Sequence, residues 1–437
     1  MSLPFASRTD EAGRVGEPAL VAGIELVGEF EDSGYREPPH LVCRPDGQIV
    51  RLPPLLYQVV RALDDRHHQD CEREPVMVRV AAELSRETGR QFTEEHVAFL
   101  VDKKLAPLGV TTHSDGSPPP PLVRSDPFLA FRFRLAVVPE HVTWFLSGLF
   151  AWLFRPLVAA GALGAFVGCE AWLWATQDTG AALQSVLFSP ANVLLVVFLA
   201  IASCAFHELG HGAACRYGGV RPGAMGCGIY LVWPAFYTDI TNSYRLGRAG
   251  RIRTDLGGVY FNALFALALI AVYGATGFQP LLVAIFCVHL EMIQQLLPTL
   301  RFDGYYIVAD LIGIPDLFKY IGPILQRFLL RRPQDERLRA LKRRPQIVVA
   351  VWVMFLIPVL LLQLGMVLVH LPQLLRADWQ KINFLMENAT ATGNPVLGVT
   401  SACLQSLLLV LPIAGLVLAL VPVVRGLVRL AWRSARR

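Results

Sequence analysis

The chain has 437 residues, of which 54% are hydrophobic and only 17% are charged. Soluble globular proteins carry about 25% charged residues, so this composition excludes an ordinary soluble enzyme and favours a membrane protein. The net charge of +5 is no nucleic-acid signature, because the arginines gather in loops between apolar segments, where they report membrane orientation. We therefore expect the lipid bilayer as a partner and no nucleic acid.

Residues 1–116 are polar and differ from the rest of the chain. Segment 41–52 has the pattern of two short strands around a Pro-Asp-Gly turn. A strand pair followed by three short helices predicts a small α+β winged-helix-like cytosolic domain. The first twenty residues have no apolar core, so we expect no cleavable signal peptide. The helices are predicted at 54–63, 76–87 and 94–105, with Thr93 as the N-cap of the third, and a stiff proline-containing linker is predicted over 117–140.

Six apolar segments follow, and each is long enough to cross a bilayer, which takes about 20 residues. An amphipathic stretch from Trp144 to Phe154 precedes the first. The expected fold is therefore mainly α, a polytopic helical membrane protein with about six transmembrane helices. Its core is expected at 141–372, and 373–437 is expected to hold an extracytosolic linker, the last transmembrane helix and a basic tail. The predicted spans cover 156–175, 188–211, 255–274, 280–300, 346–370 and 399–423.

The distribution of basic residues predicts the orientation of these spans. The loops after spans two and four and the C-terminal tail are rich in arginine. The loops between spans one and two and between spans three and four contain neither Lys nor Arg. A multi-pass protein of the cell membrane with cytosolic N- and C-termini satisfies these loops. In this topology, span two ends near the cytosolic face.

Span two is predicted to end in an H-E-x-x-H motif, His207-Glu208-Leu209-Gly210-His211. Residues four apart lie on one helical face, so both imidazoles can point at one ion, and imidazole is a common zinc ligand. Glu208 is placed to take a proton from a water molecule. Such groups are costly beside hydrocarbon, which favours a functional site. The alternative makes both histidines capping or interface residues at a helix end.

A catalytic zinc takes three protein ligands and a water molecule, so a third ligand is needed. Asp303 follows span four, which runs in the same direction as span two, so the carboxylate is expected at a depth similar to that of the histidines. Gly304 lets the backbone bend beside it. The alternative is an ordinary interfacial carboxylate paired with Arg301.

These motifs together resemble the site-2 protease family of intramembrane zinc metalloproteases, and more narrowly its peptide zinc metalloprotease branch. The resemblance rests on the H-E-L-G-H motif and on Pro298 with the later D-G pair, and it covers roughly 140–372. It implies that His207, His211 and Asp303 bind zinc and that Glu208 is the catalytic base.

Two further elements bear on this resemblance. Segment 257–262 is similar to the family's G-x-x-x-N element, in which the asparagine helps organise the site, but it lacks the proline often found there. Gln295 stands where the family's asparagine before the D-G motif is expected, which weakens a substrate-binding role for Gln295.

The N-terminal region resembles the small winged-helix peptide-binding domains found beside ribosomal-peptide modification enzymes. The similarity rests on its P-D-G turn, its L-P-P-L-L segment and its T-E-E helix. It implies that the region binds a leader peptide by adding a strand to its sheet edge. The alternative is a generic cytosolic domain with a regulatory or folding role.

Other polar positions keep two interpretations each. Glu170, His289 and Glu291 lie within predicted spans, where they line a water path or, more simply, pair across helices. The segment from Met225 to Thr241 is apolar, broken and rich in strand formers, which predicts a re-entrant hairpin. Its edge either holds a substrate in extended form or only packs. The eight cysteines form no CxxC pair, so we expect small hydrophobes without disulfides or a second metal site.

The sequence thus predicts an intramembrane zinc metalloprotease, with Zn²⁺ as cofactor, that hydrolyses a membrane-associated or ribosomally synthesised peptide. A transporter is a further expected partner. One alternative is regulated cleavage of a transmembrane signalling protein, although we find no extracytosolic peptide-binding domain of the kind such proteases often carry. Another is a membrane peptide-binding or export-accessory protein with a structural metal site. Glu208 argues against the latter, because a structural site needs no base and favours a fourth protein ligand.

Overall fold

A computed structural model describes residues 16–64, 75–121, 134–177, 179–187, 189–230, 233–331, 333–390 and 394–435. The chain divides into two compact units, Met1–Asp126 and Pro127–Arg437. Each unit has a hydrophobic core of its own.

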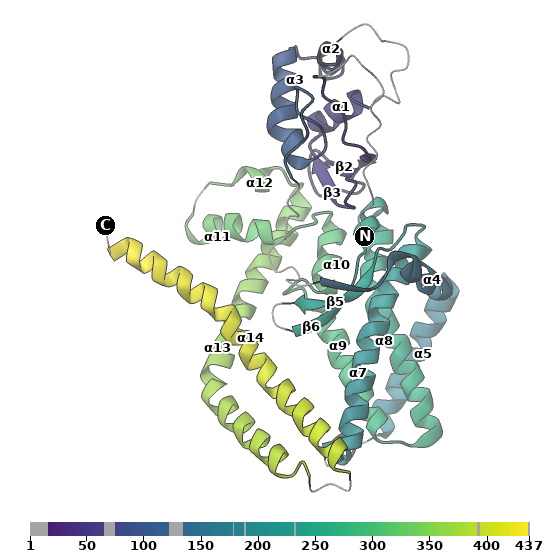
Figure 1. The fold of residues 1–437 in the computed structure, drawn as a ribbon. Coiled ribbons are helices and arrows are strands. Elements are labelled where there is room, and N and C mark those ends of the chain that lie inside the picture. The colour runs from purple at the N-terminus through teal and green to yellow at the C-terminus, as the bar shows by residue number, and fades with distance from the viewer. Residues whose placement is uncertain are drawn as a thin grey trace, which may run out of the picture. The chain divides into compact units, whose positions relative to one another are not determined.

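The first unit combines a three-stranded antiparallel sheet with three helices (Figure 1). The strands lie in the order β1 (Glu25–Glu29), β2 (His40–Cys43) and β3 (Ile49–Leu52). The predicted strand pair and the three helices are confirmed, and β1 was not predicted because its segment has acidic residues at both ends and a glycine within it. The helices are α1 (Pro54–Ala62), α2 (Val76–Thr88) and α3 (Glu94–Leu100), the last continuing as a π-helical turn, Val101–Leu105.

Local chemistry explains these elements. The side chain of Thr93 accepts a hydrogen bond from the backbone N–H of His96 (3.4 Å), as predicted for the N-cap of α3. Apolar residues at helical spacing place Val59, Val80 and Val97 in one fully buried core with the β2 residue Val42. Burial of such side chains stabilises a unit by about 1.5–3 kcal/mol each.

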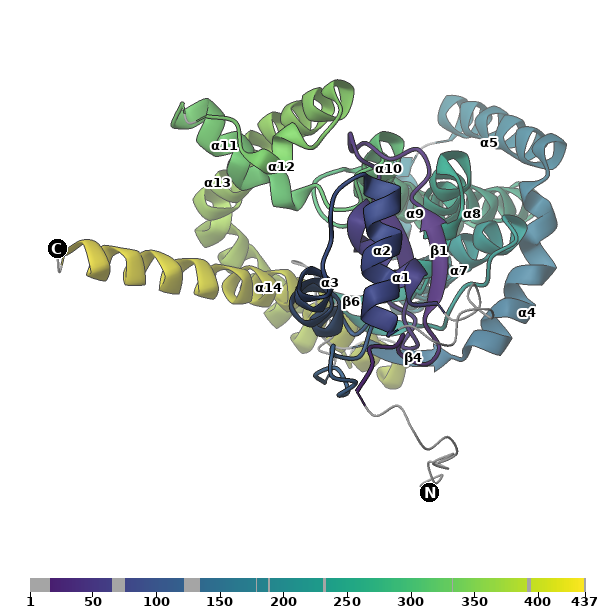
Figure 2. The same ribbon diagram turned by 90° about the horizontal axis from the view of Figure 1, so that it is seen from above.

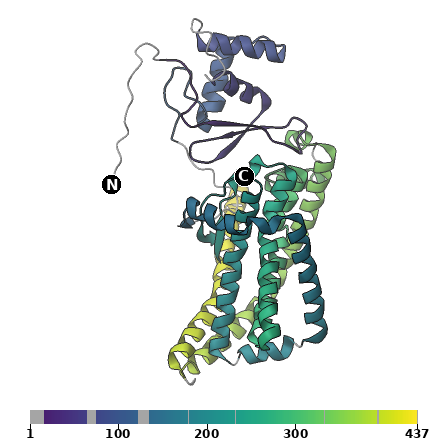
Figure 3. The same ribbon diagram turned by 90° about the vertical axis from the view of Figure 1, so that its right-hand side faces the viewer.

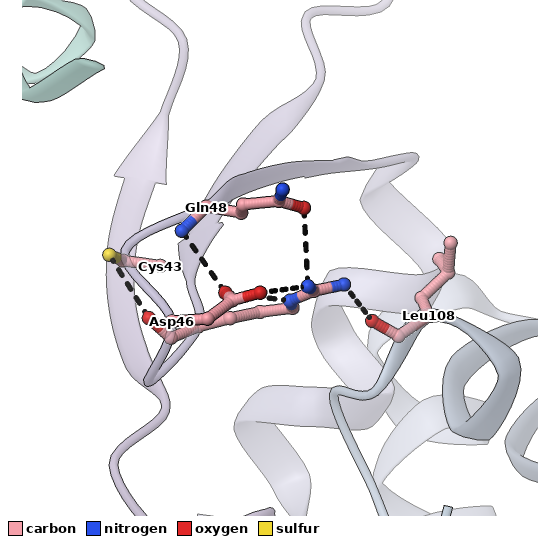
Figure 4. A network of polar contacts seen from close by, with 5 residues as sticks. Cys43, Asp46, Gln48 and Leu108 are labelled. Carbon is pink, nitrogen blue, oxygen red and sulfur yellow. Dashed lines mark hydrogen bonds and ion pairs between the residues drawn. The ribbon is translucent and has the colours of Figure 1, made fainter. Parts of the chain in front are cut away.

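A network of polar contacts that includes Asp46, Gln48 and Leu108 closes the turn between β2 and β3 (Figure 4), and the side chain of Arg44 connects its members. The guanidinium of Arg44 donates to both oxygens of Asp46, to Oε1 of Gln48 (3.1 Å) and to the carbonyl of Leu108 (3.0 Å). The side chain is only 6% exposed, and a buried charge is tolerated when it is paired and hydrogen-bonded in this way. The predicted Pro-Asp-Gly turn is therefore fixed by its own acidic residue.

The second unit is mainly helical, and its long helices run side by side (Figures 1 and 3). α7 packs along α8, and α14 packs against both α13 and α7. The buried core lies among α5 to α9, whereas α11 and α12 adjoin the start of α13 (Figure 2). The helices are α4 (Glu140–Phe150), α5 (Pro156–Thr176), α6 (Thr179–Leu187), α7 (Pro190–Tyr217), α8 (Arg248–Thr276), α9 (Pro280–Leu296), α10 (Asp303–Ile312), α11 (Ile321–Leu329), α12 (Glu336–Arg339), α13 (Arg343–Glu387) and α14 (Pro395–Ala435).

In the described part of the chain, five helices are long and apolar enough to cross a membrane: α5, α7, α8, α13 and α14. The predicted fourth span corresponds to α9, an apolar helix of 17 residues that ends before Pro298. The chain is therefore a polytopic helical protein with a small α+β part, as expected.

Three boundaries correct the sequence predictions. α7 continues six residues beyond His211, so the motif lies inside the helix and not at its end. α13 has 45 residues, so 373–387 is helical where an extracytosolic linker was expected. Of the linker predicted over 117–140, residues 122–133 lie outside the described residues and β4 (Arg134–Val138) is a strand.

A second three-stranded antiparallel sheet lies in this unit, in the order β4, β5 (Met225–Tyr230) and β6 (Trp233–Thr238). The hairpin predicted between Met225 and Thr241 is confirmed by the β5–β6 pairing. The contribution of β4 was not predicted, because this strand comes from a segment before α4 that is distant in sequence. β6 forms an edge of the described sheet and contacts α7, so the sheet adjoins the helix that carries the motif.

Candidate metal centre

The motif occupies buried turns of α7. His207 and His211 are 2% and 5% exposed, and their Nε2 atoms lie 3.2 Å apart. The i, i+4 spacing brings both rings to one face of the helix. The two imidazoles therefore present one donor atom each to the same small volume.

Glycines allow α8 to approach this face. A Cβ atom on Gly210 would overlap the carbonyl oxygen of Gly257, and one on Gly257 would lie 2.7 Å from that of Gly210. Small residues allow helix backbones to pack this closely. A Cβ atom on Gly258 would overlap the Nε2 atom of His207 and lie 2.6 Å from that of His211. The α8 backbone therefore forms one wall of the site.

Polar groups of α8 orient both imidazoles. Nδ1 of His207 contacts the side-chain oxygen of Asn262, whose amide donates to the hydroxyl of Ser203 (3.1 Å). Nδ1 of His211 donates to the carbonyl oxygen of Thr254 (2.8 Å). A partner on Nδ1 fixes the ring orientation and leaves Nε2 available to a metal. The asparagine that the resemblance assigned to site organisation therefore contacts the first histidine.

Asp303, the first residue of α10, lies beside both histidines. Its Oδ2 is 3.1 Å from Nε2 of His207, and its Oδ1 is 3.4 Å from Nε2 of His211. The alternative pairing with Arg301 is not observed, because Arg301 contacts Asp316 instead (3.2 Å). A Cβ atom on Gly304 would overlap the carbonyl oxygen of Leu296, so glycine allows α10 to start close against the end of α9.

The electrostatics favour an ionised Asp303. Burial raises the pKa of this carboxyl, but the adjacent imidazoles of His211 and His207 lower it more, so its pKa lies below the usual range. A carboxylate must be deprotonated to bind a metal ion. The side chain is only 14% exposed.

The donor set fits a zinc ion. Bonds of about 2.0–2.1 Å in tetrahedral geometry place donor atoms about 3.3–3.4 Å apart. The two Nε2 atoms are 3.2 Å apart, and each has a different oxygen of Asp303 nearby, Oδ2 at 3.1 Å from His207 and Oδ1 at 3.4 Å from His211. Oδ2 of Asp303 is buried without a hydrogen-bond partner among the described residues. Buried polar atoms are nearly always satisfied, so an ion at this position would explain this one.

The carboxylate of Glu208 lies close to the two histidines. One of its carboxylate oxygens lies within 4.8 Å of the donor atoms of His207 and His211. Its backbone carbonyl accepts a hydrogen bond from the hydroxyl of Thr238 (2.8 Å), which joins β6 to α7. The carboxylate is partly exposed in a cavity, where it can reach water and substrate.

This cavity has a volume of about 340 Å³. Its wall combines acidic residues of α7, α8 and α10 with aromatic residues of β6 and the following loop, and Gln295 also lines it. Asp255 and Asp310 lie at its edge, where Nε of the fully buried Arg251 bonds Oδ1 of Asp310 (3.1 Å). The sequence analysis missed these three residues. The i, i+7 spacing of Asp303 and Asp310 is the signal that could have revealed one of them.

Other predicted polar residues pair away from the cavity. Glu170 of α5 lies 3.0 Å from Nε2 of His289 on α9, which confirms the interpretation as a pair across helices. Glu291 hydrogen-bonds Cys204. The cysteines in the described part of the chain are free thiols, and Cys71 lies outside the described residues.

Comparison with known proteins gives limited support. No family model matches the chain, and no solved structure matches it. The chain is 26% identical over 140 residues to a protein of Bacillus subtilis (strain 168) named "Putative peptide zinc metalloprotease protein YydH". The alignment covers 32% of this chain and 56% of that protein, so the chain matches about half of its relative's length. This similarity supports a metalloprotease in general.

Proposed function

We propose that this chain is an intramembrane zinc metalloprotease of the site-2 protease type, with both termini in the cytosol. The observation that carries the proposal is the convergence of His207, His211 and Asp303 beside the Glu208 carboxylate on one cavity. Three protein donors leave a fourth position open, which is typical of a catalytic and not of a structural zinc.

In the proposed reaction, Glu208 is the proton carrier. It takes a proton from the attacking water molecule and then delivers it to the leaving amine nitrogen. When bound, a zinc ion lowers the pKa of a water molecule to about 7 and polarises a carbonyl group. Asn262 and the Thr254 carbonyl hold the two imidazoles in place, an orientation that is typically worth 10–100-fold in metal affinity or activity.

The edge of β6 is the proposed substrate site. At the other end of the ladder, the backbone N–H of Asp239 donates to the carbonyl of Ala224 (3.0 Å), next to the paired residues Met225 and Thr238. Hydrogen-bonded and non-bonded pairs therefore alternate from there. The backbone groups of the non-bonded residues then point to the outer edge of the sheet; these residues are Pro234, Phe236 and Thr238. Proline has no N–H, but at this position β5 would not accept a hydrogen bond from it, so the pairing of β5 with β6 loses nothing. Proteases need an extended substrate, and an unpaired edge binds one by adding a strand.

We further propose that the substrate is a ribosomally synthesised or membrane-associated peptide, and that the first unit binds its leader segment at an edge of the β1–β3 sheet. A transporter is the expected partner for the product. Both statements rest on the resemblances noted above and on the edge positions of β1 and β3 in that sheet.

Substitution of Glu208 tests the proposal. The full-length protein in detergent is assayed with a library of quenched fluorescent peptides, and bound zinc is measured by mass spectrometry. Glu208→Gln is expected to keep about one zinc per chain and to lose about 10²–10⁴-fold in cleavage, because only the proton carrier is removed. Glu140→Gln, at an exposed acidic residue of α4, is the matched control and is expected to cleave normally.

Two results would contradict the proposal. Cleavage by Glu208→Gln at the wild-type rate would exclude Glu208 as the base. Stoichiometric zinc without cleavage of any peptide, together with unchanged cellular function of Glu208→Gln, would favour the export-accessory alternative.

A further inference from the structure

We infer that Tyr306 is a second catalytic residue, whose phenol O–H donates a hydrogen bond to the scissile carbonyl oxygen as that oxygen becomes negative. The inference rests on the proposed function, because it concerns the transition state of peptide hydrolysis.

Tyr306 faces the site because of its position on α10. It lies one helical turn after Asp303, and Asp310 follows one turn later, so the three residues share a face of the helix. All three line the cavity, together with Glu208 and His211. The phenol therefore belongs to the same cavity wall as the proposed metal ligand and the proposed base.

In the proposed hydrolysis, a hydrogen-bond donor at this wall stabilises the carbonyl oxygen as it becomes negative. The water oxygen bonds to the carbonyl carbon while Glu208 takes one water proton, and the π electrons of the carbonyl move to its oxygen. When the carbonyl re-forms, the C–N bond breaks and Glu208 returns the proton to the nitrogen. Tyr306 donates a hydrogen bond throughout and transfers no proton. One such preorganised donor is worth about 10²–10³-fold in kcat.

The contact between Arg301 and Tyr306 leaves the phenol hydrogen available. The two side chains are hydrogen-bonded, and arginine can only donate, so the phenol oxygen is the acceptor in this bond. The O–H hydrogen of Tyr306 is not used there. A cation on the oxygen also polarises the O–H bond and makes it a stronger donor.

Two other polar side chains near the proposed ligands are engaged elsewhere. Asn262 is fully buried and contacts His207 and Ser203. The hydroxyl of Thr238 donates to the Glu208 carbonyl. Tyr230 also lines the cavity, and its hydroxyl oxygen accepts the backbone N–H of Arg301 (3.0 Å), so it is the competing candidate.

The adjacent tyrosine provides a matched control. The hydroxyl of Tyr305 accepts the backbone N–H of Leu317 (2.9 Å) and donates to Asp316 (3.3 Å). Its side chain is fully buried and is not part of the cavity wall. Tyr305→Phe therefore removes a structural hydroxyl from the same helix turn.

The experiment uses the full-length protein and a peptide that the wild type cleaves. Tyr306→Phe is expected to lower kcat by about 10²-fold, with KM and bound zinc unchanged. Calorimetry with a phosphinic analogue of the same peptide, which mimics the tetrahedral carbon, should show a similar loss of affinity. Tyr305→Phe is expected to lower the unfolding temperature and to leave kcat and analogue affinity unchanged.

Three results would overturn the inference. The first is a kcat of Tyr306→Phe within about threefold of the wild type. The second is a loss of kcat in Tyr306→Phe that is accompanied by a loss of bound zinc. The third is a larger loss of kcat in Tyr230→Phe than in Tyr306→Phe. Failure of the wild type to cleave any peptide would overturn the proposed function itself. Cleavage by the wild type that is unchanged in Tyr306→Phe would overturn only the role of Tyr306, so the two failures can be distinguished.

Discussion

The two sheets of this protein are both three-stranded and antiparallel, with strands in sequence order, but they face different surroundings. In the first sheet, β2 is largely buried against the apolar core, and Arg44 is satisfied within its own turn. In the second sheet, β6 lines a cavity and donates a hydrogen bond to α7 through Thr238. The same architecture thus supports a core in one unit and a polar site in the other.

Two buried charged side chains illustrate the difference. Arg44 has its partners within the first unit, whereas Oδ2 of Asp303 has no hydrogen-bond partner among the described residues. Leaving a buried acceptor unsatisfied costs about 1–3 kcal/mol. Such atoms also occur in the first unit, at Nδ1 of His40 on β2, but Asp303 on α10 differs because its two oxygens face the Nε2 atoms of two histidines. A metal ion between these atoms would remove the cost, which is why the comparison points to the surroundings of Asp303 as the functional site.

The largest expected effect follows from removal of Asp303, the proposed third ligand. Asp303→Ala is expected to lower zinc affinity by more than about 10²-fold, which exceeds the cost of losing an orienting partner, and to abolish peptide cleavage. Metal analysis and peptide assays on the same preparation measure both effects. Asp46→Ala, in the first sheet, should lower the unfolding temperature without changing bound zinc. Full zinc occupancy in Asp303→Ala would refute the ligand set.

The next effect concerns the close approach of α8. Gly258→Ala is expected to displace the imidazoles, because the added Cβ meets both Nε2 atoms, and therefore to reduce bound zinc and cleavage together. Gly274→Ala, on the same helix with no atom within 4 Å of its added Cβ, should be neutral or more stable by about 0.4–1 kcal/mol. Equal zinc content in the two variants would show that the α8 backbone does not contact the site.

A smaller effect is expected from the link between β6 and α7. Thr238→Val removes one hydrogen bond, worth about 0.5–1.5 kcal/mol, and should lower kcat/KM by about 2–10-fold while zinc stays bound. Thr276→Val is the control: its hydroxyl donates to the helix carbonyl of Val272 (2.8 Å) and accepts the backbone N–H of Phe278 (3.3 Å), and Thr276 is not part of the cavity wall. If the two variants have the same kcat/KM, the sheet is not coupled to Glu208.

The smallest effect concerns the first sheet and is selective for the substrate. Arg44 and Gln48 pair beside the turn, so by alternation Arg51 turns its N–H to the free edge of β3. Arg51→Pro should raise KM about 2–10-fold for a precursor with a leader segment and leave KM for a short leaderless peptide unchanged. A parallel rise for both peptides would place leader binding elsewhere.

Much of this fold could be predicted from periodic patterns in the sequence. The hydrophobic segments predicted α5, α7 and α8 because a membrane helix must be apolar over most of its length, and Thr93 predicted a cap because its side chain satisfies a local N–H. The H-E-x-x-H spacing also predicted that His207 and His211 share a face.

The pairing of strands that are distant in sequence could not be predicted in this way. β4 joins β5 across some ninety residues, and no local pattern encodes such a partner. The roles of Thr238 and Tyr306 depend on which cavity they face, which follows from the packing of β6 and α10. The length of α13 was missed because the fifth span was predicted from its apolar residues and ended at 370, whereas the helix continues through Pro372 into a more polar segment.

The length of α13 limits how the protein can sit in a bilayer. Its 45 residues have a contour of about 67 Å at 1.5 Å per residue, whereas a hydrocarbon layer is about 30 Å thick. The helix is therefore longer than one crossing requires, so the turns that carry Arg376, Asp378 and Lys381 can lie outside the hydrocarbon while they continue the same helix.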